Sequence, residues 1–452
     1  MCQAEVGNSG CAKVLTAEMI RNVNKEQFRN ALHLGLGQAI IYARDHDVDE
    51  FRDVILDACL HCYSCDPQCE GTRSAYMLEV VNLLSEKNFY YDAVLKSLPE
   101  DGDTWNTVQR FHFAACLALE GNEAAIRLMY ESYKPGPSMG ELIGIDFLHL
   151  GGINGLLFVA EGMGALLMTK PERVDIGYLL SVSIDECGEQ ETLDALRKAG
   201  EQNPRIEAYR LAAEARERKA LRPSEKPPVW SESYEQIKSR LPEINIPLLR
   251  LWGERANNED FDLAAHGLIA ARNAKEQAAY LHIFGRRQFP LDPSVLLPLV
   301  EIEEEQIGFA AASALTHIAH PAVRELAFRL VETRSELRLE AVDLLARNYQ
   351  AGDRTTMLRW FDKEQEPTVL HSYAMDMEDF WKAHPDEESE VPMLLALYAK
   401  GPCSFCREGV VRRLIELNAL TEELRAECAY DANDDVRELV TAEKAGSSLR
   451  SE

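Results

Sequence analysis

Three apolar-striped segments follow one another over residues 304–349, and they constrain the fold more than any other stretch of the chain. Their apolar side chains recur at intervals of three and four, which places them on one stripe of a helix. They are Ile307, Ala310, Ala311, Ala314, Leu315 and Ile318, then Val323, Leu326, Ala327, Leu330 and Val331, then Leu337, Leu339, Val342, Leu344 and Leu345. The gaps are short, so consecutive helices must pack as antiparallel neighbours. The pattern predicts an all-α protein, an α-solenoid of stacked helical hairpins.

The remainder of the chain divides by its regularity. Helical patterning is irregular before a cluster of prolines and more regular after it, and no sustained two-residue alternation requires a sheet. We expect an N-terminal arm (1–23), an irregular helical-hairpin half (24–220), a proline-rich linker (221–246), a half of regular repeats (247–443) and a polar tail (444–452). At 452 residues the chain exceeds one ordinary compact domain, but a stack of repeats has no such size limit.

The charge balance excludes some classes of partner. The chain has 75 acidic and 48 basic residues, a net charge of −27 at pH 7. Such a surface repels phosphates, so nucleic acid and anionic lipid are not expected partners. A basic protein or peptide would instead be attracted. Hydrophobic residues make up 46% of the chain, as in an ordinary folded protein.

The sequence also predicts a cytoplasmic protein. The start, MCQAEVGNSGCAK, lacks the charged and apolar regions of a signal peptide. Eleven cysteines at irregular spacing do not resemble a disulfide framework, so we expect reduced thiols. The most membrane-like run, residues 151–168, contains Glu161 and five glycines. We interpret these glycines as close helix packing and expect no membrane span.

The first candidate for chemistry is a cysteine-rich segment. Cys59, Cys62, Cys65 and Cys69 have the spacing C-x2-C-x2-C-x3-C, which is that of a bacterial ferredoxin run. Four thiolates this close could hold an iron–sulfur cluster or zinc. The alternative is buried small side chains at the end of a helix, because the proline that follows the last ferredoxin cysteine is replaced by Glu70 and no second run exists.

A second cysteine group lies near the C-terminus. Cys403 and Cys406 precede a predicted helix, and Cys428 lies 22 residues beyond Cys406. With His371 or His384 as a fourth ligand they could hold zinc; the alternative is buried thiols. No βαβ pattern surrounds the pair, which argues against thioredoxin-like redox chemistry.

A dense polar turn next to the first cysteine group is a candidate ligand-binding or partner-binding site. Here Asp66, Glu70 and Arg73 lead into a helix, and Arg407 stands beside the second cysteine pair. Glu70 and Arg73 could grip a ligand or a peptide. The alternative is local helix capping with a Glu70–Arg73 ion pair.

Two short motifs resemble HEAT repeats. His320-Pro321-Ala322-Val323-Arg324 is similar to the start of the second helix of such a repeat, and Asp434-Asp435-Val436-Arg437 repeats the pattern. The resemblance, which extends to armadillo-like solenoids, implies that Val enters the core and Arg leaves it. The segments Pro402-Cys403-Ser404-x-Cys406-Arg407 and Glu427-Cys428-x-Tyr430-Asp431 also look similar to segments of uncharacterised bacterial HEAT-repeat proteins. The resemblance implies a binding surface more often than an enzyme.

We therefore expect a scaffold that recognises a protein or peptide, which is basic if electrostatics guide it, on a curved acidic surface. The alternative is a metalloprotein or a thiol-dependent enzyme that uses one cysteine group. No metalloprotease, serine-hydrolase, Walker or dinucleotide-binding motif occurs, so catalysis stays open. The histidines, including His112 and His149, lie on apolar helices and are expected in the core or at helix interfaces.

Overall fold

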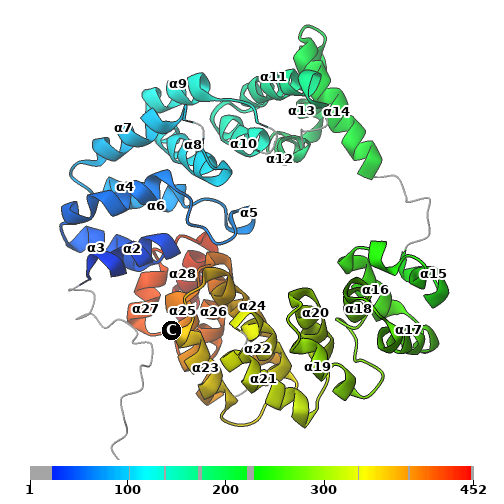
Figure 1. Ribbon diagram of the computed structural model, residues 1–452. Helices are drawn as coiled ribbons and strands as arrows, with labels where there is room; N and C mark the ends of the chain where they lie inside the picture. Colours follow the sequence, from blue (N-terminus) through cyan, green and yellow to red (C-terminus); the bar gives the residue numbers. More distant parts are fainter. Residues whose placement is uncertain are drawn as a thin grey trace, which may run out of the picture. The chain divides into compact units, whose positions relative to one another are not determined.

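The computed structural model describes residues 23–100, 102–136, 139–171, 176–220, 229–333, 335–384 and 387–448. Within these ranges every regular element is a helix and no strand occurs (Figure 1). The all-α prediction is therefore confirmed for the described residues. The predicted N-terminal arm lies outside them apart from Val23, and so does the start of the proline-rich linker.

The chain forms two compact units. One unit, here called the central unit, contains the described residues between 229 and 399, and the other, the terminal unit, contains those between 23 and 220 and between 400 and 448. The first boundary falls inside the predicted linker. The second divides the predicted regular half, because residues 400–443 belong with the N-terminal helices. Sequence periodicity does not show that the chain returns, after the central unit, to pack against the N-terminal helices.

The central unit is built from helices that pack in chain order. Its elements are η3 (Val229–Ser231), α15 (Tyr234–Lys238), η4 (Leu241–Glu243), α16 (Ile246–Arg255), α17 (Asn258–Ala270), α18 (Ala274–Ile283), η5 (Pro293–Val295), α19 (Leu297–Val300), α20 (Glu305–Leu315), α21 (Pro321–Thr333), η6 (Ser335–Leu337), α22 (Arg338–Ala346), α23 (Asp353–Lys363), α24 (Pro367–Ala383) and α25 (Glu387–Lys400). Helices α16, α18, α20, α22 and α24 each pack on the next. As predicted, α21 begins at Pro321 and Val323 is fully buried. Arg324 is half-buried rather than turned to solvent, and it pairs with the buried Asp353 at 2.7 Å.

The terminal unit contains two sets of helices. The first set is α2 (Lys25–Leu34), α3 (Gly37–Asp45), η1 (Asp49–Phe51), α4 (Arg52–Leu60), α5 (Pro67–Glu70), α6 (Ser74–Asn82), α7 (Lys87–Ser97), α8 (Thr104–Leu119), α9 (Glu123–Ser132), α10 (Gly140–Gly151), α11 (Ile153–Thr169), α12 (Tyr178–Cys187), α13 (Glu189–Gly200) and α14 (Pro204–Ala220). The second is α26 (Ser404–Glu416), α27 (Glu422–Cys428) and α28 (Asp434–Ser448).

Two glycines of the membrane-like run, Gly155 and Gly164, serve close helix packing, as predicted. A Cβ atom added to Gly155 would lie 1.8 Å from the backbone oxygen of Phe147, and one on Gly164 would lie 1.8 Å from that of Arg205. Only glycine lets α11 approach α10 and α14 this closely. Within the described residues, no helix has both the length and the apolar character needed to cross a bilayer.

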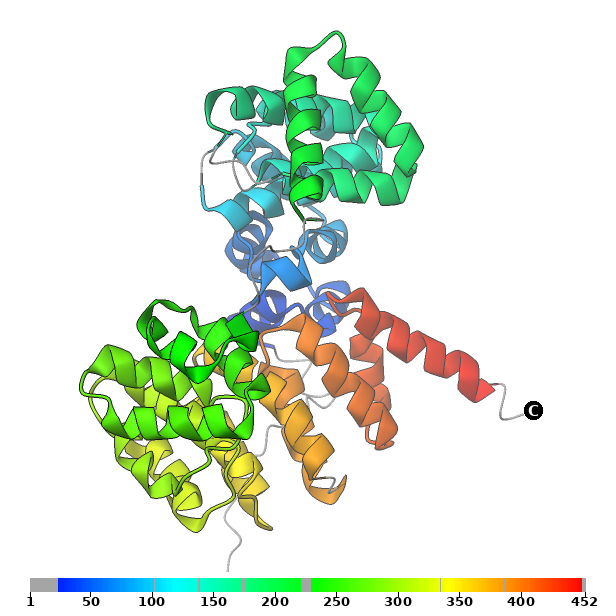
Figure 2. The same ribbon diagram turned by 90° about the vertical axis from the view of Figure 1, so that its right-hand side faces the viewer.

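The two ends of the terminal unit meet at a contact that we call the junction, where α26, α27 and α28 pack against α2, α3, α5 and α6. The views in Figures 1 and 2 place these C-terminal helices beside the N-terminal ones. The backbone N–H of Ala432 donates to the oxygen of Gly35 at 2.9 Å, and Arg437 pairs with Glu79 at 2.7 Å. At Gly37 an added Cβ would lie 1.9 Å from the oxygen of Glu427, so α3 and α27 are in backbone contact.

Candidate ligand-binding pocket

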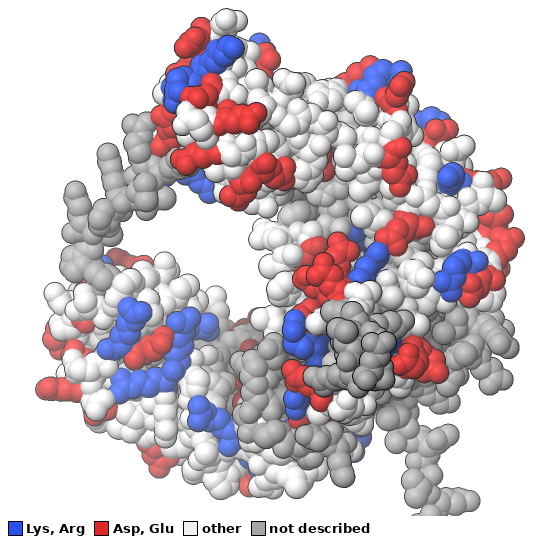
Figure 3. All heavy atoms as spheres, turned by 180° about the vertical axis from the view of Figure 1, so that it is seen from behind, with Lys and Arg blue, Asp and Glu red and all other residues white. Residues whose placement is uncertain are grey.

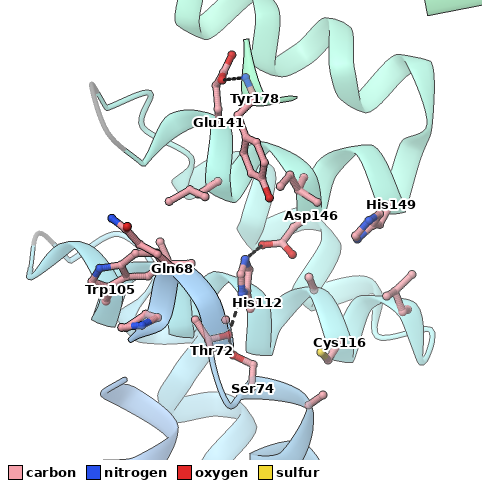
Figure 4. A pocket seen from close by; sticks show the side chains of 18 of the residues that line it. Gln68, Thr72, Ser74, Trp105, His112, Cys116, Glu141, Asp146, His149 and Tyr178 are labelled. Carbon is pink, nitrogen blue, oxygen red and sulfur yellow. Dashed lines mark hydrogen bonds and ion pairs between the residues drawn. The ribbon is translucent and has the colours of Figure 1, made fainter. Parts of the chain in front are cut away.

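A pocket of about 690 Å³ lies in the terminal unit, between α8 and α10 and beside the link from α5 to α6 (Figure 4). This volume is within the usual range for small-molecule sites. Its lining residues are Pro67, Gln68, Gly71, Thr72, Ser74, Ala75, Trp105, Val108, His112, Ala115, Cys116, Leu119, Glu141, Leu142, Ile145, Asp146, His149, Tyr178 and Arg216.

Helical spacing brings the polar groups of the pocket together. On α8, Trp105, His112 and Cys116 line the pocket because they are seven and four residues apart and share one helix face. Asp103 fixes where α8 begins, since its carboxylate accepts from the backbone N–H of Trp105 at 3.0 Å. On α10, Asp146 lines the pocket with residues one turn before and after it, and α10 packs directly on α8.

A hydrogen-bonded chain runs from the floor of the pocket to His112. The Ser74 hydroxyl donates to the backbone oxygen of Gln109 at 2.8 Å, so its own oxygen is left to accept from Thr72 at 2.9 Å. The Nδ1 atom of His112 lies 2.8 Å from the Thr72 oxygen and completes the chain as a donor. The Nε2 atom lies on the side of the ring that faces Asp146 (Figure 4).

His112 is held neutral. Burial lowers its pKa to about 4, with a smaller effect from the charge of His149 and an opposing one from a hydrogen bond to the Leu142 backbone. The Nε2 atom lies 3.4 Å from Oδ2 of Asp146, which is long for a hydrogen bond. An ion pair there would need a protonated ring, and the low pKa of His112 disfavours it at neutral pH.

Asp146 is the least satisfied polar group of the pocket. Its side chain is 9% exposed, and Oδ2 has no hydrogen-bond partner. Burial raises its pKa well above the ordinary value for an aspartate, because no donor or cation offsets the lost hydration. A buried polar atom of this kind costs folding free energy, of the order of 1–3 kcal/mol. Such a cost at a pocket wall is typical of a group that awaits a ligand.

Glu141, also on the pocket wall, is satisfied by the protein itself. Its carboxylate accepts from the backbone N–H groups of Gly177, Tyr178 and Leu179 at 3.0, 2.8 and 3.3 Å, and so caps the start of α12. The hydroxyl of Tyr209 donates to it at 2.7 Å. Glu141 therefore joins α10 to α12 and α14, and the shape of the pocket depends on it.

This pocket is not predicted from the sequence. His112 and His149 are expected in the core or at helix interfaces, and no prediction concerns Asp146. A usable signal exists, since Asp146 is the one acid inside the apolar run Leu142-Ile143-Gly144-Ile145-Asp146-Phe147-Leu148. A lone carboxylate on an apolar helix needs a partner or a function.

The polar turn that the sequence did single out lies at the junction. Glu70 Oε2 accepts from the backbone N–H and the hydroxyl of Ser404, both at 2.8 Å, and Arg73 donates to the oxygen of Pro402 at 3.2 Å. Asp66 caps α5 by accepting from the N–H of Gln68 at 3.1 Å. These contacts match the capping alternative and extend it, because Glu70 and Arg73 bind a segment more than 300 residues away. Partner binding by these residues stays a prediction.

Arg407 is buried at the same junction. Its Nη1 atom lies 3.0 and 2.8 Å from the two oxygens of Asp431, and it also donates to the backbone oxygens of Leu34 and Gly35. Both side chains are at most 1% exposed. The guanidinium thus joins α26 to the end of α2 in the interior of the terminal unit, and partner binding by Arg407 stays a prediction.

The first cysteine group is spread over different environments. Cys59 is fully buried in α4, Cys62 and Cys65 are half-buried, and Cys69 is exposed. No disulfide joins the described cysteines, and no three of these four sulfur atoms lie within 4.8 Å of one another. The iron–sulfur or zinc site predicted from these four residues alone stays a prediction.

The second cysteine group is partly assembled. Cys403 and Cys406 belong to a possible metal-binding group, with their sulfur atoms within 4.8 Å of each other. Cys428 is fully buried in α27, and its sulfur is not part of that group. His371 and His384, the predicted candidates for a fourth ligand, belong to the central unit, in α24 and at its C-terminal cap.

The thiols do not have the electrostatics of nucleophiles. Burial raises the pKa of Cys59 and Cys62, and it raises that of Cys65 to about 11 with help from the charges of Glu70 and Cys403. Hydrogen bonding to Cys403, then burial, raises the pKa of Cys406. Activated cysteines show the opposite shift.

Charge does not separate into large patches on the face drawn in Figure 3, where acidic and basic side chains are intermixed. The acidic net charge therefore acts as a diffuse field there rather than as one acidic surface. Comparison with protein-family models and with curated proteins gave no match.

Proposed function

We propose that the protein is a helical scaffold that binds a protein or peptide, and that the pocket between α8 and α10 receives a basic side chain of that partner. The observation that carries the proposal is the unpartnered Oδ2 of Asp146, buried at the wall of a pocket of about 690 Å³. An α-solenoid of HEAT-like hairpins is part of this proposal. The chain-order packing of α16, α18, α20, α22 and α24 supports it.

The pocket chemistry favours a donor as the ligand. Asp146 faces the pocket, and the Nε2 atom of His112 lies beside it as a second acceptor when the ring proton is on Nδ1. A primary ammonium carries three donors and can bond both atoms at once. Its alkyl stem would lie against the apolar part of the wall, formed by Leu142, Ile145 and Trp105. A lysine side chain has both features.

Electrostatics favour the same choice. The desolvation cost of the Asp146 carboxyl is already incurred when the protein folds. On binding, the attraction between Asp146 and a cationic ligand therefore has to offset only the desolvation of the ligand. The net charge of −27 attracts cationic segments over a distance set by ionic strength. Anionic ligands would instead be repelled by Asp146, by Glu141 and by the net negative charge of the chain.

Peptide binding tests the proposal. An immobilised library of peptides that vary one central position among lysine, norleucine, glutamine and glutamate would be probed with the full chain. We expect lysine peptides to bind best, and we expect Asp146→Asn to remove the preference for lysine over norleucine. Asp185→Asn, an exposed carboxylate on α12, is the matched control and leaves the preference intact.

Proton release on binding distinguishes a cationic ligand from a neutral hydrogen-bond donor. Burial raises the pKa of Asp146 in the free protein, and a bound ammonium would lower it, so binding of a cation is coupled to proton release. Calorimetry of the selected lysine peptide in buffers of different ionisation enthalpy should therefore detect proton release. Equal binding by all four peptide classes, or lysine binding that survives Asp146→Asn, would overturn the assignment of the pocket.

A metalloprotein is the second candidate, and the spacing of the Cys403 and Cys406 sulfur atoms favours it. The raised thiol pKa values do not support a thiol-dependent enzyme.

A further inference from the structure

The pocket between α8 and α10 is longer than one side chain requires. Its wall on α8 follows a single helix face from Trp105, in the first turn, to Leu119, the last residue of the helix. At 1.5 Å per residue, residues 105–119 span about 21 Å. A lysine side chain bound beside Asp146 would leave both ends of this wall uncovered. We call the pocket together with this wall the groove.

The polar groups lie in the middle of the groove. His112 is seven residues from Trp105 and seven residues from Leu119, and Asp146 faces it from α10 with 3.4 Å between Nε2 and Oδ2. Figure 4 shows Trp105 on one side of His112 and Asp146, and His149 on the other. The groove therefore has a buried carboxyl at its centre and a large apolar side chain at each end of its α8 wall.

Two large apolar side chains of the groove are open to solvent. Leu119 is 62% exposed, and Tyr178, at the start of α12, is 53% exposed. Glu141 accepts from the backbone N–H of Tyr178 at 2.8 Å and so fixes the position of this residue beside the pocket. Exposed apolar side chains that adjoin a pocket are typical of a surface that contacts another protein.

The dimensions favour an extended segment over a helix as the occupant. A helix with its side chains is about 10–12 Å wide. A pocket of about 690 Å³ along a wall of about 21 Å is too narrow to admit it. An extended chain advances about 3.3 Å per residue, so about three residues cover the distance from His112 to Trp105 or to Leu119.

We propose that the groove recognises a lysine that is flanked on both sides by large apolar residues in an extended segment of a partner protein. This inference rests on the proposed function, in which Asp146 receives the lysine. Side chains two and four positions from the lysine point to the same side of an extended chain as the lysine does. The flanking apolar residues therefore occupy those positions, one toward Trp105 and one toward Leu119.

Four peptides test the groove by fluorescence anisotropy with the full chain. The first has a central lysine and leucines two and four positions before and after it. The second replaces the lysine with norleucine, and the third replaces all four leucines with alanine. The fourth moves the leucines to positions one and three, which an extended chain turns away from the groove. We expect the third and fourth peptides to bind about 10- to 100-fold more weakly than the first.

A protein variant locates the contact. Leu119→Gln should weaken binding of the leucine peptide about 3- to 10-fold, should leave the alanine peptide unaffected, and should keep the preference for lysine over norleucine. The matched control is Met168→Gln, on α11 and outside the groove, where the side chain is 60% exposed. This control should change none of the affinities.

The outcomes separate this inference from the function on which it rests. If the lysine peptide binds better than the norleucine peptide but the leucines and their positions make no difference, the groove is wrong and the role of Asp146 stands. Equal weakening of the leucine and alanine peptides by Leu119→Gln would also overturn the groove. Equal binding of the lysine and norleucine peptides would refute the proposed role of Asp146, and the lysine-centred motif with it.

Discussion

Two regions of the terminal unit each bury an aspartate, and only one of them supplies a partner. At the junction, Asp431 is fully buried and Arg407 contacts both of its oxygens, while the N–H of Asn433 donates to it at 2.9 Å. In the pocket, Asp146 is almost as buried, but its Oδ2 has no partner. Burial raises the pKa of both carboxyls, and only at Asp431 does a guanidinium oppose the rise.

The difference distinguishes buried polar groups that stabilise the fold from buried polar groups that remain able to bind a ligand. A carboxylate with its donors in place contributes to the contact of distant helices, and removing one partner leaves an uncompensated charge. A carboxyl without donors contributes nothing to cohesion and only carries a cost. Opposite effects of substitution at the two positions would confirm this distinction.

The largest effect is expected at the junction. Arg407→Met leaves Asp431 as an unpaired buried carboxyl and should lower the free energy of opening of the terminal unit by about 3–5 kcal/mol. Hydrogen exchange of α2 and α26 measures this per segment, which suits a chain of two units. Asp45→Asn, at an exposed ion pair, is the control and should have no measurable effect. If Arg407→Met cost as little as Asp45→Asn, the buried pair would not hold the junction.

Gly37→Ala should have the second-largest destabilising effect. Its new Cβ would lie 1.9 Å from the backbone oxygen of Glu427, so α3 and α27 must separate, at a cost of about 1–3 kcal/mol. Gly409→Ala, in α26, meets no atom within 4 Å and should be neutral or stabilising by about 0.5–1 kcal/mol. Equal effects of the two changes would mean that the helices are not in backbone contact.

Asp146→Leu should stabilise the protein, in contrast to the two substitutions at the junction. Replacing an unpartnered carboxyl by an apolar side chain should raise the free energy of opening of α8 and α10 by about 1–2 kcal/mol at pH 7. The folded pKa of Asp146 lies above the unfolded value of 3.8, so its contribution to stability is full below that value and is lost as pH rises. The gain from Asp146→Leu should therefore be smaller at pH 4 than at pH 7. A loss of stability at pH 7 would show that Asp146 has a partner in solution.

The smallest effect concerns His112. Its pKa falls from 6.5 to about 4 on folding, so its contribution to stability is present above pH 6.5 and is lost as pH falls toward 4. Between pH 7 and pH 5.5 this amounts to about 1 kcal/mol, a difference that His112→Gln should abolish. Selective labelling of histidine and NMR titration should find a ring that stays neutral at pH 5.5. A ring that titrates near pH 6.5 would contradict this account.

Local features could be predicted from the sequence, and distant contacts could not. Periodicity and capping residues act within a few positions, so Asp103, the helix start at Pro321 and the close packing at Gly155 and Gly164 were predictable. The bond from Ser404 to Glu70 joins residues 334 positions apart, and no local signal encodes it. Asp146 stands out in sequence as a lone acid in an apolar run, but no sequence signal pairs it with His112, and only the packing of α8 on α10 brings the two together.

The insertion of the central unit between residues 222 and 400 has a consequence for synthesis of the chain. Helices α2, α3 and α6 are translated early, yet α26 to α28, which cover them, emerge only after the whole central unit. At about 5–20 residues per second, the ribosome adds the intervening stretch in roughly 10–40 seconds. For that interval the surface around Gly37 and Arg73 is uncovered in the nascent chain, where a chaperone would find it.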